Sequence, residues 1–235
     1  MSQQILVLNK FSKIYDKGKT GVFDASFTVK KGDFHAFIGE NGAGKTTIIK
    51  SVIGAYTQFE GEILINSISN RNPKSRQGLG YVPEVALFPK NVTTFNYLLS
   101  LGMLSGISKD SCIQKIDHFL EKLQITNLKN KYPTNFSSGQ KKKVLLIQAL
   151  LCDPEIIVLD EPASNLDVSA RFELFSILED LNKQGITIFI SSHILSEIDK
   201  YANSLTLIHK GQVLYNGKKY NTLENIFYEK VLESN

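Results

Sequence analysis

The chain has 235 residues, of which 42% are hydrophobic, and this length can bury one sizeable core or one core with a lobe. Its net charge is +4, from 27 basic and 23 acidic residues, and a charged fraction of 21% excludes a largely disordered chain. The basic residues form no stripe of the kind that binds nucleic acid, so we expect no nucleic-acid partner.

The first third of the chain contains short runs that predict β-strands. β-Branched and aromatic residues are frequent in these runs, and turn-forming residues separate them. The runs are Ile5–Leu8, Ala25–Val29, Phe34–Ile38, Glu62–Ile65 and Leu79–Val82.

The sequence GENGAGKT at residues 39–46 joins the third of these runs to a helical stretch, Thr46–Ile53. It fits the pattern G-x-x-x-x-G-K-[ST], in which glycines let backbone N–H groups wrap around a phosphate chain. The helix that follows presents its positive N-terminal end to the same phosphates. Lys45 adds a charge at the β/γ oxygens, and the Thr46 hydroxyl can ligate Mg²⁺.

A glycine-rich turn before a purely structural helix is the alternative interpretation of this segment. The strand–loop–helix setting favours a phosphate-binding loop, and therefore a site for a nucleoside triphosphate. The residues of this loop are Gly39, Glu40, Asn41, Gly42, Ala43, Gly44, Lys45 and Thr46.

After Pro83 the apolar residues recur at spacings of three and four, which predicts helices. The helices expected are Thr93–Gly106, Lys109–Gln124 and a third from Ser137 or Ser138 to Leu151. We interpret residues 88–152 as a helical lobe inserted into an α/β core. The two cysteines, Cys112 and Cys152, form no disulfide framework or metal site, and we expect both to be small buried residues.

In the last third, strands and helices alternate. This alternation predicts an α/β fold with a mainly parallel sheet and helices on its faces. The strands expected are Ile156–Leu159 and Thr187–Ser191, the helices are Val168–Gln184 and Leu195–Tyr201, a hairpin joins Ser204–His209 to Gln212–Tyr215, and Leu223–Asn235 forms an amphipathic tail.

The strand Ile156–Leu159 delivers two carboxylates, Asp160 and Glu161, at its C-terminal end, where ligands bind in open α/β sheets. An ordinary strand ending in a charged turn would have the same sequence pattern, but the phosphate-binding loop in the same chain favours a catalytic role for the two carboxylates. Asp160 would hold Mg²⁺ together with Thr46. Glu161 would polarise the water that attacks the γ-phosphate.

The segment Phe136-Ser137-Ser138-Gly139-Gln140, at the start of the third helix, carries a resemblance to a known family. The chain resembles the nucleotide-binding subunit of ATP-binding-cassette (ABC) transporters, whose signature is L-S-G-G-Q. This sequence departs from the signature at Phe136 and Ser138. The resemblance implies that Ser137, Ser138, Gly139 and Gln140 cap the γ-phosphate of ATP bound to an opposite subunit.

The resemblance assigns further residues in family order. It implies that Tyr15 stacks on adenine, although a packing tyrosine at a strand end is a serious alternative. Thr47 would lie near the α-phosphate, Ser164 to Asp167 would form the D-loop at the dimer interface, and His193 would hydrogen-bond the γ-phosphate. Glu84 stands where many relatives carry glutamine, and it would contact Mg²⁺.

The implied architecture is a P-loop NTPase core with an N-terminal antiparallel β-subdomain and an inserted helical subdomain, in one domain over residues 1–235. The implied function is an ATPase with ATP and Mg²⁺ as cofactors. It would pair head to tail with a second ATP-binding subunit and power an integral membrane permease from the cytoplasmic face of the cell membrane. No stretch approaches the roughly 18 apolar residues that span a bilayer, so any membrane role needs such a partner.

Combinations such as Tyr-Val-Pro-Glu at 81–84 and Ser-His-Ile-Leu-Ser-Glu at 192–197 resemble the ABC-2-type exporter branch, which exports drugs, peptides, lipids or polysaccharides. An importer or a lipoprotein-extraction ATPase is the nearer rival. A soluble ABC ATPase that acts on DNA or ribosomes is a more distant one.

Overall fold

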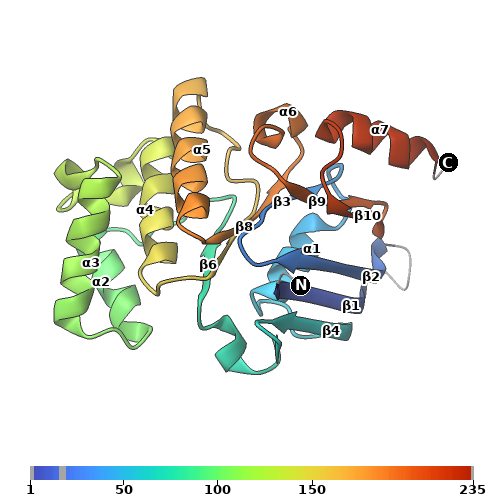
Figure 1. Ribbon diagram of the computed structural model, residues 1–235. Helices are drawn as coiled ribbons and strands as arrows, with labels where there is room; N and C mark the ends of the chain where they lie inside the picture. The colour runs from blue at the N-terminus through green and yellow to red at the C-terminus, as the bar shows by residue number, and fades with distance from the viewer. Residues whose placement is uncertain (1–2, 16–19, 234–235) are drawn as a thin grey trace.

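An antiparallel sheet forms one part of the molecule, which the computed structural model describes over residues 3–15 and 20–233 (Figure 1). Its strand order is β2-β1-β4-β5, and β1 pairs with both β2 and β4. The strands are β1 (Gln4–Tyr15), β2 (Thr20–Lys30), β4 (Glu60–Ile65) and β5 (Ile68–Ser69).

The first two strands run further than their apolar runs predict. The register of β1 against β2 shifts between Leu8 and Phe11, and Lys10 and Asp24 take positive φ angles of 50° and 48°. Such bulges interrupt the alternation of apolar and polar residues that marks a strand. The prediction therefore recovered only the regular parts of each strand.

The second sheet is mainly parallel and has the order β10-β9-β3-β8-β7-β6. Only the β9–β10 pair is antiparallel. Every residue of β3, β7, β8 and β9 is buried, so these strands lack the alternation of apolar and polar residues of a half-exposed strand. β7 is a continuous apolar run, whereas β3, β8 and β9 also bury His, Ser or Thr side chains. The strands are β3 (Phe34–Ile38), β6 (Leu79–Val82), β7 (Ile156–Leu159), β8 (Thr187–Ser192), β9 (Ser204–His209) and β10 (Gln212–Lys218).

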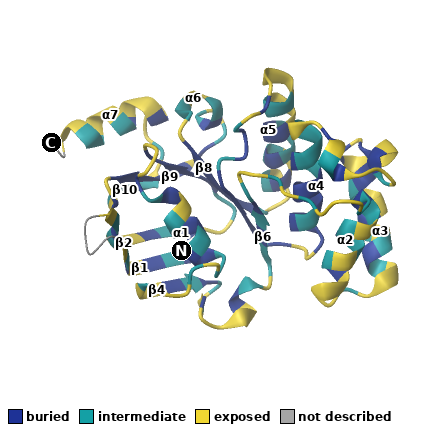
Figure 2. Cartoon of the chain, turned by 180° about the vertical axis from the view of Figure 1, so that it is seen from behind, coloured by how far each residue is buried: buried dark blue, intermediate teal, exposed yellow. Residues whose placement is uncertain are grey.

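Two hydrophobic clusters cover the two faces of this sheet. Phe37 and Phe189 belong to the cluster shared with the antiparallel sheet and α1, whereas Ala36 and Ile190 belong to the cluster shared with the other helices. Neighbouring residues of one strand thus enter opposite cores, as the period of two requires. Figure 2 shows the central strands, such as β8, in dark blue, and exposed residues on the outer helices and the loops.

The chain leaves the sheet after β6, forms three helices and returns at β7, which lies directly beside β6. In Figure 1 these helices form the end of the molecule remote from both termini. The observed α/β architecture, with its N-terminal antiparallel sheet, confirms the predicted fold class. The predicted limits of the lobe, 88–152, stay a prediction. The helices are α1 (Lys45–Val52), α2 (Thr94–Leu104), α3 (Lys109–Lys122), α4 (Ser138–Leu150), α5 (Val168–Lys183), α6 (Leu195–Ile198) and α7 (Leu223–Glu233), with 3₁₀ turns at Pro73–Arg76, Thr126–Leu128 and Pro133–Asn135.

Two smaller expectations have different outcomes. Cys112 is buried as predicted, but Cys152 is exposed, because it follows the end of α4 in a turn at the surface. The predicted tail forms α7, and its last two residues, 234–235, lie outside the described part of the chain. None of the helices in the described part is long and apolar enough to cross a membrane.

Candidate active site

The loop at residues 39–44 connects the C-terminal end of β3 to the N-terminus of α1, in the setting that the sequence predicts. Gly42 and Gly44 have φ angles of +82° and +109°, which L side chains rarely adopt. A Cβ atom at Gly39 would lie 2.3 Å from the carbonyl oxygen of Ile208. Glycine is therefore required here by the backbone path that brings N–H groups round the start of a helix.

Lys45 is 6% exposed and its ammonium lies over this loop. Its Nζ donates to the carbonyl oxygens of Gly39 at 2.7 Å and Glu40 at 3.1 Å, and lies 3.3 Å from Glu161 Oε1. This position faces a cavity of about 270 Å³. The cavity is lined by Asn41, Gly42, Gly44, Lys45, Thr46, Thr47, Glu84, Glu161 and His193.

Asp160, at the end of β7, is 2% exposed and accepts two hydrogen bonds on Oδ1. Ser191 Oγ donates to it at 2.9 Å, and Thr46 Oγ1 does so at 3.5 Å. Burial raises the pKa of Asp160, and the hydrogen bonds from Ser191 and Thr46 oppose that rise. The carboxylate is thus held beside the first turn of α1, where the sequence predicts a metal.

The side chains at this position suit Mg²⁺ better than they suit a metal ion whose ligands all come from the protein. Over residues 3–15 and 20–233, no three His, Cys, Asp or Glu side chains converge on one point. One hydroxyl and one carboxylate are a donor set that suits Mg²⁺, which takes most of its ligands from phosphates and water. Glu84 lines the same cavity, and its charge raises the pKa of Asp160.

Glu161 follows Asp160 with a φ angle of 44°, a strained value for a residue with a side chain. Its backbone N–H donates to Ser191 Oγ at 2.9 Å. Its Oε2 lies 2.8 Å from His193 Nδ1 and accepts the backbone N–H of His193 at 3.3 Å. Its Oε1 is buried and has no hydrogen-bond partner in the described chain, although Lys45 is near enough for an ion pair.

Ser191 was not predicted as a site residue, yet its hydroxyl holds both the carboxylate of Asp160 and the backbone of Glu161. It donates to the side chain of Asp160 and accepts the N–H of Glu161. The signal in the sequence is a serine at the C-terminal end of an apolar strand, β8. Its importance depends on β8 lying beside β7, which only the sheet order shows.

The other residues predicted for the site do not line this cavity. Ser137 caps α4 through its hydroxyl, and Gln140 completes a capping box, so both have local partners. Ser164 Oγ donates to the Glu161 carbonyl at 2.8 Å, and Asp167 caps α5. Tyr15 ends β1 with 38% exposure, and the residues after it, 16–19, lie outside the described part.

Ser138 and Gly139 also lie apart from the phosphate loop. Ser138 is exposed, and a Cβ at Gly139 would lie 3.0 Å from the Ala170 side chain on α5. Within one chain, therefore, residues 137–140 and the loop at 39–46 do not meet in one cavity.

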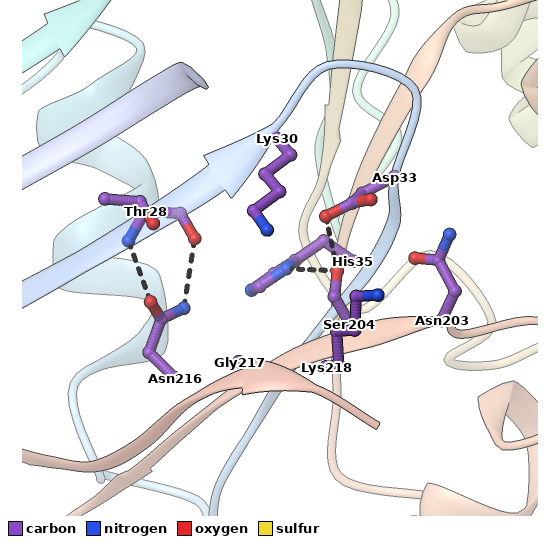
Figure 3. A pocket seen from close by; sticks show the side chains of 9 residues that line it. All are labelled: Thr28, Lys30, Asp33, His35, Asn203, Ser204, Asn216, Gly217 and Lys218. Carbon is purple, nitrogen blue, oxygen red and sulfur yellow. Dashed lines mark hydrogen bonds between the residues drawn. The ribbon is translucent and has the colours of Figure 1, made fainter. Parts of the chain in front are cut away.

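A second cavity, of about 260 Å³, lies at the other end of β3, beside the start of β9 and the ends of β2 and β10 (Figure 3). His35 forms its floor and is 1% exposed. Ser204 Oγ donates to Asp33, so it accepts from His35 Nδ1–H at 2.8 Å. Burial lowers the pKa of His35 to about 3, so the imidazole is neutral at neutral pH. Its Nε2 then accepts from Thr206 Oγ1 at 2.8 Å, and Asn216 Nδ2 donates to the same hydroxyl at 2.9 Å.

Replacing His35 by Gln is expected to flatten the dependence of stability on pH. The folded state has a lowered His35 pKa, so the unfolded state binds more protons between about pH 3 and 6.5. The stabilising contribution is complete above the unfolded pKa and is lost as the pH falls. The parent chain should lose up to about 1.4 kcal/mol per pH unit more than H35Q. Urea unfolding at several pH values measures this difference, and parallel curves for the two proteins would contradict it.

Comparison with known proteins gives consistent results. A profile described as "ABC transporter" matches residues 22–164. The chain is 49% identical over 205 residues to a putative ABC transporter ATP-binding protein of Mycoplasma pneumoniae, covering 87% of this chain and 63% of that protein. It is 36% identical over 214 residues to the bacitracin transport ATP-binding protein BcrA of Bacillus licheniformis, covering 89% of this chain and 68% of BcrA. A solved ATP-binding subunit of an ABC transporter superposes with a TM-score of 0.85 at 28% identity, covering 97% of this chain and 99% of that one.

Proposed function

We propose that this chain, which belongs to the ABC transporter family, is the ATP-hydrolysing subunit that powers transport through a separate integral membrane permease. The observation that carries the proposal is that the phosphate-binding loop, Glu161 and His193 line one cavity. Asp160 accepts a hydrogen bond from Thr46, which lines the same cavity. Since the chain spans about two thirds of its relatives' length, the activity of the whole protein is part of this proposal.

In this mechanism the loop and the α1 N-terminus bind the phosphate chain through backbone N–H groups. Lys45, now directed at the Gly39 and Glu40 carbonyls, turns its ammonium to the β/γ oxygens. Thr46 and Asp160 would hold Mg²⁺, with Glu84 in contact, and the bound metal would supply positive charge against the phosphates. Thr47 lies near the α-phosphate, and Tyr15 stacks on adenine.

Glu161 is the general base or positioner of the attacking water. Among the described residues its Oε1 accepts no hydrogen bond, and its ion-pair partner Lys45 turns to the phosphates in this mechanism. The ring Nδ1 and the backbone N–H of His193 both lie within hydrogen-bond distance of Oε2. One carboxylate oxygen is thus fixed and the other is available to accept a proton. His193 orients Glu161 so that it can act in line with the γ-phosphate.

The site is completed by a second ATP-binding subunit, identical or paralogous. Residues 137–140 do not line the cavity of the phosphate loop in their own chain, yet they form the start of α4, whose N-terminus suits a phosphate. In a head-to-tail dimer these residues face the γ-phosphate of the partner. Residues Ser164 to Asp167 would then line the interface and connect the two sites.

The membrane partner would dock where exposed apolar residues surround the Glu84 loop and the end of α2, on the cytoplasmic face of the cell membrane. Val85 is 61% exposed, Leu87 81% and Leu104 83%.

Export of a drug, peptide, lipid or polysaccharide is supported by the ABC-2-like segments at 81–84 and 192–197 and by similarity to a bacitracin transport protein. Co-purification with a membrane subunit, followed by a transport assay in vesicles, distinguishes export from import. Bound nucleic acid would favour the soluble alternative.

Replacing Lys45 by Ala tests the proposed function directly. The ammonium is buried beside the loop and carries the main positive charge of the cavity, so its loss should weaken ATP binding by about 10- to 100-fold. Phosphate release and nucleotide titration measure this. Lys31→Ala is the control, because it removes an exposed lysine whose partner, Glu155, is remote from the cavity. Equal activity in K45A and the parent would refute the assignment.

A further inference from the structure

Lys142 lies on α4 two residues after the signature-like segment, and its side chain leaves the helix towards the active site. It is 4% exposed. Its Nζ donates to the carbonyl oxygens of Pro83 at 2.7 Å and Glu84 at 2.6 Å, which lie 59 and 58 residues earlier in the chain. Burial lowers the pKa of Lys142 to about 8, and the nearby Glu84 and Asp160 charges oppose that change.

This contact joins two parts that serve different nucleotides in the proposed dimer. Glu84 lines the cavity of its own chain, whereas residues 137–140 belong to the cavity of the partner. Both hydrogen bonds end on backbone carbonyls, so they fix the path of the loop after β6 and leave the Glu84 carboxylate free. A buried ammonium with two acceptors is costly to separate from them, since all three groups would lose their partners.

We propose that Lys142 is a positioning residue that makes the Glu84 loop and the start of α4 move as one unit. Through it, binding of Mg²⁺ and ATP in one chain orients the segment at 137–140 towards the other. This inference rests on the proposed function, because it requires ATP-dependent dimers.

The experiment separates binding of ATP from dimer formation. The parent is the full chain with Glu161→Gln, which slows turnover. Trinitrophenyl-ATP fluorescence with Mg²⁺ measures binding, sedimentation velocity measures the dimer, and thermal unfolding measures stability. Lys142→Met removes the ammonium but keeps the length of the side chain. Lys142→Arg keeps charge and donors. Lys143→Met is the matched control, because Lys143 also makes two bonds from α4, to the Leu123 carbonyl and Glu173.

In Lys142→Met we expect ATP binding within about twofold of the parent and an ATP-induced dimer weakened by about tenfold, a usual size for coupling between sites. Lys142→Arg should restore most of the dimer, and Lys143→Met should leave it unchanged. Unchanged dimerisation in Lys142→Met overturns the inference. So does a parallel loss of ATP binding and stability, or an equal loss of dimer in Lys143→Met. If the parent itself binds no ATP, the proposed function has failed instead.

Discussion

Replacing Glu161 by Gln is expected to lower kcat for ATP hydrolysis by about 10²- to 10⁴-fold, the usual contribution of a positioned acid or base. Gln keeps the size of the side chain and can still meet His193, but it cannot accept a proton from water. The binding groups for the phosphates, on the loop and at Lys45, stay in place. ATP affinity should therefore stay within about threefold of the parent chain.

Steady-state phosphate release and nucleotide binding measure the two quantities separately. Glu155→Gln is the matched control, since Glu155 lies just before β7, whereas Glu161 follows that strand's other end. It pairs with Lys31 at a half-exposed position, and its neutralisation should leave kcat unchanged. A Glu161→Gln chain that hydrolyses ATP at the parent rate would show that the base is another group.

The strand–loop–helix at 34–52 could be predicted from the sequence because its signal is local. Glycines at 39, 42 and 44 indicate the path of the backbone, and the buried strand that precedes them, β3, is apolar apart from His35. The two carboxylates at the end of β7 could be predicted for the same reason. The hydrogen bonds of Ser191 to the Asp160 carboxylate and to the Glu161 backbone could not be predicted, because they depend on the order of β7 and β8 in the sheet.

The position of Lys142 could not be predicted either, because it depends on contacts between residues far apart in the chain. On α4, which begins SGQKKKV, three consecutive lysines predict a solvated surface, yet the middle one is buried against the loop after β6. The role of residues 137–140 could not be tested in one chain for a different reason. Their distance from the phosphate loop is a property of the single chain, so their predicted role depends on a second chain.

That second chain can be tested by complementation of two inactive variants. Replacing Ser137 by Arg places a long charged side chain at the α4 N-terminus, where the γ-phosphate of the partner would lie, and removes a helix cap. ATPase activity should fall by at least about 10²-fold, the cost of losing a preorganised donor in such a site. Ser108→Arg is the control, because it removes the corresponding cap of α3, remote from the proposed interface.

Mixing Ser137→Arg with Lys45→Ala then separates action within a chain from action between chains. In a mixed dimer one site combines the damaged loop with the damaged signature, and the other combines the two intact halves. Equal amounts assorting at random should recover up to about one quarter of the parent activity, because half of the dimers are mixed and each keeps one of two sites. If the signature acted on its own chain, both variants would stay inactive and no mixture would recover. The ATPase rate as a function of mixing ratio, at concentrations above the dimer dissociation constant, therefore decides whether the phosphate loop is half of a shared site.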